Sequence, residues 1–141
     1  GDRVAQRILE HSYEAVHVRS IWEGMAALAL RQERSFRLVY EVNALPSVEL
    51  KYHYPDVVEH PELMARLRGW ERALLHGADL ILTPSDTTRR FLKRFGVGSA
   101  RVRVIPNGVD PQRIPATPLP EPTPAPLLLY LGTLAPWQGL P

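Results

Sequence analysis

The chain has 141 residues, of which 45% are apolar and 23% charged, a composition typical of soluble globular domains. The formal net charge is only +2, and no basic run is interleaved with aromatic residues, which argues against a nucleic-acid-binding protein. Cysteine is absent, so disulfide bonds and thiolate metal sites are excluded, and the five histidines lack the paired spacing of a metal site. We expect a cytoplasmic protein with no metal ion.

Almost all basic residues are arginines, since only Lys51 and Lys93 are lysines. Two explanations remain open at this point. One is biased codon usage in a GC-rich genome, and the other is an arginine-rich face that meets phosphates or anionic lipid.

Short apolar runs alternate with helical patterns along the chain. A helical pattern over residues 3–10 comes first, and strands are expected at residues 15–18, 38–42, 80–83 and 102–105. The strand runs are β-branched and nearly continuous, as in strands covered on both faces. Helices are expected near residues 23–31, 62–76 and 85–95. This alternation predicts an α/β fold with a Rossmann-like parallel sheet.

Two of these helices carry clear local signals. Leu63, Leu67, Trp70 and Leu74 form one apolar stripe along residues 62–76. The helix over residues 85–95 opens on Ser85 as its N-cap and ends at Gly96.

The composition changes sharply at residues 111–126, which hold seven of the fourteen prolines. Such a segment forms an extended linker. Residues 127–134 follow as an apolar run into Gly132, which predicts a buried strand. We therefore expect an N-terminal domain over residues 1–110, incomplete at its start, and a truncated second domain beginning at residues 127–141.

Several motifs together resemble glycosyltransferase family 4, the retaining enzymes of GT-B fold. They read ADLILTPS at residues 78–85, VIPNGVD at 104–110 and YLGTL at 130–134, with VHVRSIWEG at 16–24 and YEVN at 40–43. The resemblance implies a partial GT-B fold, in which an N-terminal Rossmann-like domain presents the acceptor and a C-terminal domain holds the nucleotide-sugar. Ligands of parallel α/β sheets bind beyond the C-terminal ends of the strands.

Two catalytic candidates lie at such a strand end. Asn43 occupies the position at which many members of the family carry a histidine near the transferring sugar. It can hydrogen-bond a sugar hydroxyl but cannot act as a base. Glu41 points to the same side of the strand and could bind an acceptor hydroxyl or act as a base. The alternative for both is a satisfied polar strand end.

The acceptor candidates follow the first strand, where a tryptophan among polar groups suits a sugar ring. They are Arg19, Ser20, Trp22, Glu23 and Gly24. The alternative for Trp22 is a core residue under the helix. Residues 51–54, in a polar and aromatic stretch, are expected in a loop that covers the acceptor.

The donor candidates follow the last strand expected. Gly132 would let the backbone approach the diphosphate of the donor. The alternative for this glycine is a plain turn between a strand and a helix. The family usually has an arginine and a lysine nearby, and the corresponding residues here are Thr133 and Gln138, both neutral. Residues 107–110 are expected to be structural, with Gly108 in a tight turn and Asn107 or Asp110 as a cap.

One helix face is strongly basic, and its residues are Arg89, Arg90, Lys93 and Arg94. This face is either solvated or docks on the inner face of the cell membrane, where lipid-linked acceptors occur.

The leading hypothesis is a glycosyltransferase that moves a sugar from a nucleotide-sugar to a hydroxyl of a glycan, lipid or small molecule. It needs no cofactor or metal, and the fragment alone is expected to be inactive. A non-catalytic sugar- or partner-binding module is the second hypothesis. A sugar-nucleotide epimerase is the third, although the PNGVD motif argues against it.

Overall fold

The structure is a computed structural model that describes residues 2–114, 118, 125 and 127–134. The chain divides into two compact units, Gly1–Pro106 and Asn107–Pro141. Within the described residues, every strand of the sheet and every α-helix lies in the first unit.

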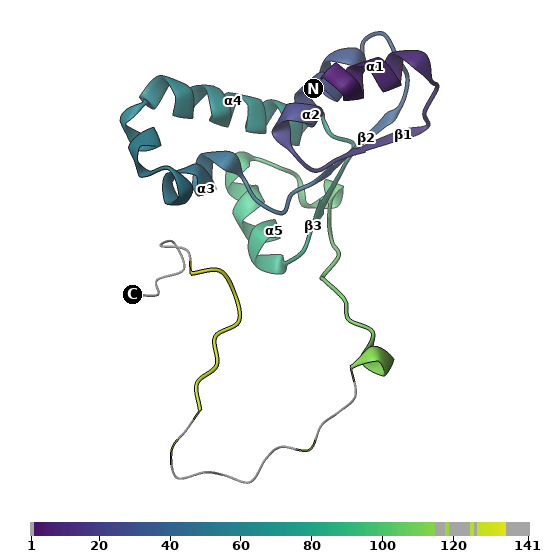
Figure 1. Ribbon diagram of the computed structural model, residues 1–141. Coiled ribbons are helices and arrows are strands. Elements are labelled where there is room, and N and C mark those ends of the chain that lie inside the picture. The colour runs from purple at the N-terminus through teal and green to yellow at the C-terminus, as the bar shows by residue number, and fades with distance from the viewer. Residues whose placement is uncertain (1, 115–117, 119–124, 126, 135–141) are drawn as a thin grey trace. The chain divides into compact units, whose positions relative to one another are not determined.

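The first unit is built on a four-stranded parallel sheet in the order β1-β2-β3-β4 (Figure 1). The strands are β1 (Ala15–Val18), β2 (Arg37–Glu41), β3 (Leu80–Thr83) and β4 (Val102–Val104). Each lies within one residue of the range expected from the apolar runs. The α/β class and the parallel Rossmann-like sheet are therefore confirmed.

The helices are α1 (Asp2–Glu10), α2 (Ile21–Leu30), α3 (Pro46–His53), α4 (Pro61–Gly77) and α5 (Asp86–Leu92). Four of them confirm the helical patterns. A 3₁₀ turn (Lys93–Phe95) extends α5 to Gly96, which adopts a φ of 76° and so ends the segment in the left-handed region that favours glycine. Further 3₁₀ turns are Pro55–Glu59, Ser99–Arg101 and Pro111–Arg113.

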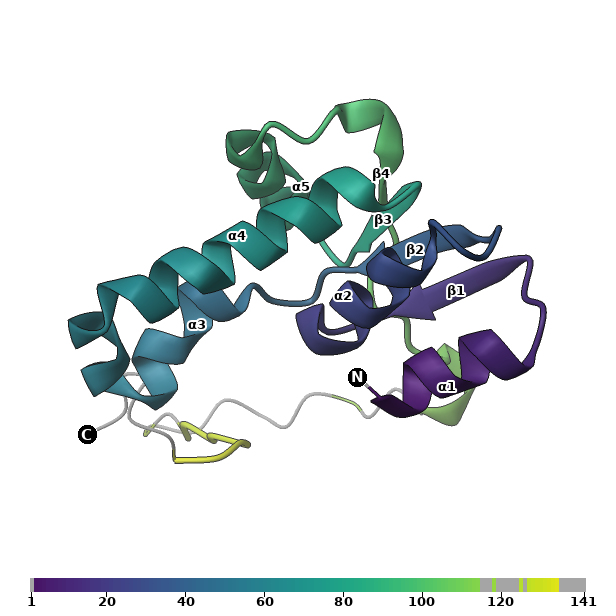
Figure 2. The same ribbon diagram turned by 90° about the horizontal axis from the view of Figure 1, so that it is seen from above.

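Helix α3 corrects one expectation, because residues 51–53 form its last turn rather than a loop (Figure 2). Pro46 opens the helix at a position where a missing N–H is tolerated. The next N–H group, that of Ser47, donates to a carboxylate oxygen of Glu71 at 2.7 Å, and the Ser47 hydroxyl donates to the other oxygen at 2.5 Å. Glu71 of α4 thus caps α3 from outside.

The two faces of the sheet differ in burial. Each crossover moves one strand in the same direction, and right-handed crossovers then place α2, α4 and α5 on one face. Leu38, Tyr40 and Ile81 point to that face and are at most 1% exposed. Side chains that alternate to the other face are half-buried or exposed, such as Val39 and Leu82. The expectation of strands covered on both faces is therefore wrong for the described part of the chain.

The apolar stripe of α4 is also displaced from the expected one. Leu67 and Leu74 are buried as expected, but Leu63 is 41% exposed. The other buried residues of the helix are Met64, Glu71 and Leu75, and Glu71 is buried where it caps α3.

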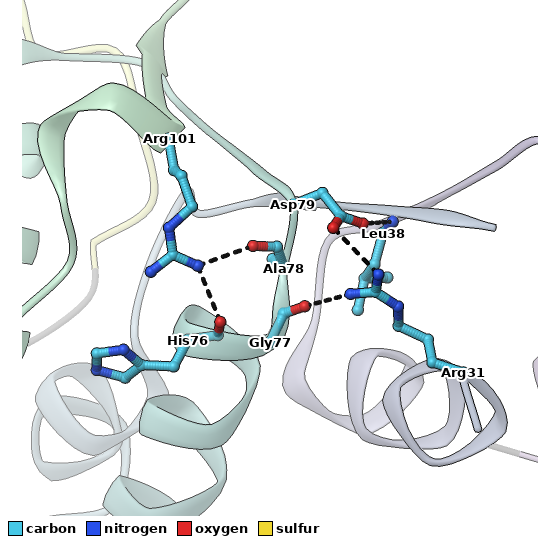
Figure 3. A network of polar contacts seen from close by, with 7 residues as sticks. All are labelled: Arg31, Leu38, His76, Gly77, Ala78, Asp79 and Arg101. Atoms are coloured by element: carbon cyan, nitrogen blue, oxygen red, sulfur yellow. Dashed lines mark hydrogen bonds and ion pairs between the residues drawn. The ribbon is translucent and has the colours of Figure 1, made fainter. Parts of the chain in front are cut away.

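A network of polar contacts lies at the N-terminal ends of β2 and β3 (Figure 3). Arg31 donates to the Gly77 carbonyl at 2.5 Å and to Asp79 at 3.0 Å, and the second carboxylate oxygen of Asp79 accepts from the Leu38 N–H at 2.7 Å. Arg101 approaches the same turn and donates to the carbonyls of His76 and Ala78. The two guanidinium groups therefore satisfy carbonyls left open by the end of α4.

The second unit contains one short regular element in its described part. Asp110 caps the turn Pro111–Arg113 and accepts from the Gln112 N–H at 3.0 Å, as expected. Gly108 has no positive φ and lies in no turn, so that expectation is wrong.

Residues 127–134 form no strand, and their leucines are 76–93% exposed, so the predicted buried strand is also wrong. A strand needs a neighbour to accept its backbone hydrogen bonds, and the described residues provide none for this segment.

None of the described helices is long and apolar enough to cross a membrane.

Candidate functional site

A polar cluster surrounds Glu41 at the C-terminal end of β2. One carboxylate oxygen lies 3.0 Å from His17 Nε2. The other lies 3.1 Å from Arg19 Nε and accepts a hydrogen bond from Asn43 Nδ2 at 3.0 Å. Three side chains thus hold one carboxylate in place at the edge of the sheet where ligands of parallel sheets bind.

The strand register explains why these residues meet. Val18 lies beside Tyr40, so the next residues, Arg19 and Glu41, are level with one another. His17 precedes Arg19 by two residues, and Asn43 follows Glu41 by two, so all four side chains point to the same face. The sequence predicted Arg19, Glu41 and Asn43 as site residues and missed His17. His17 lies two residues before Arg19 on the same strand, and this spacing was the signal that could have identified it as a site residue.

The electrostatics of the cluster decide what Glu41 can do. The hydrogen bond from Asn43 has the largest effect and lowers the pKa of Glu41. Burial comes next and acts to raise it, but the charges of Arg19 and His17 and the hydrogen bond with His17 keep the pKa below its usual value. A carboxylate with a lowered pKa is a weak base but a good hydrogen-bond acceptor. Glu41 is therefore suited to accept a hydrogen bond from a hydroxyl group rather than to remove its proton.

The start of α2 lies directly after β1 and uses two of the acceptor candidates as its cap. The Ser20 hydroxyl accepts from the Glu23 N–H and donates to the Glu23 carboxylate. The Ser20 side chain thus caps the helix by satisfying the open N–H group of Glu23. Both residues thus have a structural function at the site.

Trp22 is not the core residue of the alternative interpretation, because it is 53% exposed. Its ring meets that of Trp70 edge to face, with the centroids 5.5 Å apart. The Arg66 guanidinium lies 4.8 Å from the centroid of the Trp70 ring. Trp70 is partly buried and packs against the core, in agreement with its place in the expected apolar stripe, whereas its contacts with Trp22 and Arg66 were not predicted.

Gly24 is buried, and its role in the structure is packing. A Cβ at this position would lie 2.3 Å from a terminal carbon of Leu74 on α4. The glycine therefore allows α2 and α4 to approach one another, and a contact of Gly24 with an acceptor remains only a prediction.

The donor candidates belong to the second unit or lie outside the described residues. Gly132 and Thr133 are exposed, and the Thr133 carbonyl accepts from the Tyr130 hydroxyl at 2.8 Å. Gln138 lies outside the described residues. Donor binding by these residues stays a prediction.

The basic face is formed by α5 and the 3₁₀ turn after it, and all four of its side chains are exposed. Arg89 pairs with Asp86 at 2.7 Å, Arg90 donates to Thr87, and Arg94 lies over the Phe91 ring.

Among the residues that the structure describes, no three His, Cys, Asp or Glu side chains gather as metal ligands would.

A family model described as Glycosyltransferase Family 4 matches residues 2–113 of this sequence. The chain belongs to glycosyltransferase family 4. It is also 28% identical over 101 residues to the D-inositol 3-phosphate glycosyltransferase of Geodermatophilus obscurus. That alignment covers 72% of this chain and 22% of the relative, so the chain spans only a small part of the relative's length.

Family membership confirms the resemblance that the motifs indicated. The region that matches family 4 contains the whole Glu41 cluster, the start of α2 and the Trp22–Trp70 pair. Gly132, Thr133 and Gln138 lie beyond it, so the family match gives no support to the donor candidates.

Proposed function

We propose that this chain provides the acceptor side of a glycosyltransferase that moves a sugar from a nucleotide-sugar to a hydroxyl group. The observation that carries the proposal is the Glu41 carboxylate, which His17, Arg19 and Asn43 hold at the C-terminal edge of the sheet in a family 4 chain. A glycan, a lipid or a small molecule would supply the hydroxyl.

The described geometry suggests how an acceptor would bind. Its hydroxyl would donate to Glu41, while the Asn43 amide and the Arg19 guanidinium would contact neighbouring oxygens. The exposed ring of Trp22 would lie against a sugar face. Positioning would then supply much of the rate enhancement, because holding two reactants in line removes a large entropic part of the barrier.

The remaining features of the reaction rest on family membership. We propose transfer of a hexose with retention of configuration, and we propose that it needs no metal or cofactor. A donor-side domain would neutralise the departing diphosphate. We place the enzyme in the cytoplasm, with Arg89, Arg90, Lys93 and Arg94 contacting anionic lipid at the inner face of the membrane.

A second candidate function is a non-catalytic sugar-binding module. Two observations favour it: Asn43 cannot titrate, and the lowered pKa of Glu41 makes that carboxylate a weak base.

A transfer assay separates the two functions. The chain would be fused to the donor-side domain of a family 4 enzyme and incubated with labelled nucleotide-sugars and a panel of hydroxyl acceptors, including D-inositol 3-phosphate. We expect transfer by the fusion, a loss of roughly 10²-fold in Glu41→Ala, and no turnover by residues 1–141 alone. A folded fusion that binds sugars but transfers none would favour the non-catalytic module.

A further inference from the structure

A cavity of about 230 Å³ lies beside the Glu41 cluster, between the loop that follows β2 and the helices α3 and α5. Its walls are mostly apolar. The apolar side chains are Val42, Ala44, Leu45, Val48 and Phe91. Val42 and Leu45 are buried, so these walls are anchored in the core of the first unit.

Asn43 connects the cavity with the polar cluster. It is one of the residues that line the cavity, and its amide also donates to Glu41 at 3.0 Å. A ligand that reaches Glu41 through a hydroxyl can therefore place an adjoining group in the cavity. Thr87 and Thr88 of α5 complete the lining with hydroxyl groups.

The volume limits what the cavity holds. Pockets that enclose a whole small ligand are usually about 300–1,000 Å³, whereas an apolar cavity of about 150 Å³ takes up benzene. At about 230 Å³, this cavity has room for one ring or a short alkyl group, which is part of a ligand.

The charge of the lining limits the ligand further. Of the described residues that line the cavity, none is a lysine, arginine or histidine, and the one ionisable side chain is that of Glu49. A phosphate placed here would meet a carboxylate and apolar walls, with no cation to offset its desolvation.

We infer that the acceptor carries an uncharged apolar substituent, an aromatic ring or a short alkyl group, which fills this cavity while an acceptor hydroxyl contacts Glu41. The inference rests on the proposed function and narrows its acceptor class. A phosphorylated polyol is not the acceptor that this cavity fits.

Matched pairs of sugars test the inference on the 141-residue chain. Dissociation constants for phenyl and methyl glycosides of glucose, galactose and mannose would be measured by NMR titration, with D-inositol 3-phosphate as the anionic probe. For the configuration that binds, we expect the phenyl glycoside to bind at least about tenfold more tightly than its methyl partner. We expect the phosphate to bind more weakly than the phenyl glycoside.

Two variants show whether the cavity is responsible. Ala44→Phe fills it from the loop and Thr87→Phe fills it from α5, so a folding defect in one leaves the other informative. Each should abolish the phenyl preference and leave methyl glycoside binding unchanged. Ala29→Phe, at an exposed position of α2, is the matched control and should keep the preference.

The outcomes separate this inference from the proposed function. Equal affinity for phenyl and methyl partners, tighter binding of D-inositol 3-phosphate, or a preference that survives both filling variants would overturn the cavity assignment and leave the sugar site intact. Absence of binding by every glycoside would overturn both.

Discussion

Arg31 and Asp79 show how single side chains join the elements at the edge of the sheet opposite Glu41. Arg31 extends from the end of α2 and contacts both the Gly77 carbonyl and Asp79 (Figure 3). Burial acts to raise the pKa of Asp79, but the hydrogen bond from the Leu38 N–H and the Arg31 charge outweigh it and hold the pKa below its usual value. The ionised form of Asp79 is therefore part of what stabilises the fold.

Asp79→Asn should destabilise the chain in a pH-dependent way. The pKa of Asp79 is lower in the folded chain than the value of about 3.9 in unfolded chains. The ionised carboxylate therefore stabilises the fold above about pH 4, and this stabilisation is lost as the pH falls below that value. Because the Asp79 side chain is 38% exposed, we expect a loss of only about 1 kcal/mol at pH 7. Chemical denaturation of both proteins at pH 7 and near pH 3 measures the difference.

Asp56→Asn is the matched control, since Asp56 is an exposed aspartate in a 3₁₀ turn. It should change the free energy of unfolding little at either pH. If the loss of unfolding free energy in Asp79→Asn stays constant down to pH 3, the charge of Asp79 is not what stabilises this edge of the sheet.

At the scale of elements, α2 and α4 pack through two glycine contacts. The position of a Gly24 Cβ is taken by Leu74, and the position of a Gly77 Cβ is taken by Leu28. Each helix thus inserts a leucine where the other has a glycine. This close approach brings Trp22 of α2 against Trp70 of α4.

Gly24→Ala should therefore destabilise the chain, whereas Gly69→Ala should stabilise it. The first substitution forces the fully buried Leu74 to move, at a cost of about 1–3 kcal/mol. A Cβ at Gly69 meets nothing within 4 Å, so alanine there gains about 0.5–1 kcal/mol from helix propensity. Thermal or denaturant unfolding of the two variants measures the change in the free energy of unfolding. Changes of the same sign in both variants would contradict this account of the helix contact.

The elements differ in how far the sequence predicted them. The strands were predictable because each is a short apolar run, and α4 and α5 because their caps or periodicity are clear. Helix α3 was not, since its N-terminus is capped by a residue 24 positions away in sequence. The burial of the same residue, Glu71, on α4 was not predicted either, because periodicity assigns apolar side chains to the core and a carboxylate is not expected there.

At the scale of the whole molecule, the two units differ in how much function they support. The first unit has a formed sheet edge, a held carboxylate and an adjoining cavity, and it lies within the family match. The described part of the second unit has exposed leucines and one 3₁₀ turn. The first unit is therefore the part of this chain in which the proposed acceptor site can be tested.

The candidate site was predictable only in part at this scale. Position at a strand end identified Glu41 and Asn43, and the tryptophan beside polar residues identified Trp22. Sequence spacing does not state which strands are neighbours, so the approach of His17 to Glu41 needed the register of β1 and β2. The contact of Trp22 with Trp70 needed the packing of α2 against α4 for the same reason.

The most direct test of the central claim is an amide NMR titration of the 141-residue chain with methyl glycosides. We predict shifts concentrated at residues 17–20 and 41–43, and a dissociation constant about tenfold higher in Glu41→Gln, since a hydrogen bond to a charged group is lost. Glu59→Gln, at an exposed glutamate, should leave the dissociation constant unchanged. Shifts confined to other residues, or equal affinity in Glu41→Gln, would contradict the assignment of this sheet edge as the acceptor site.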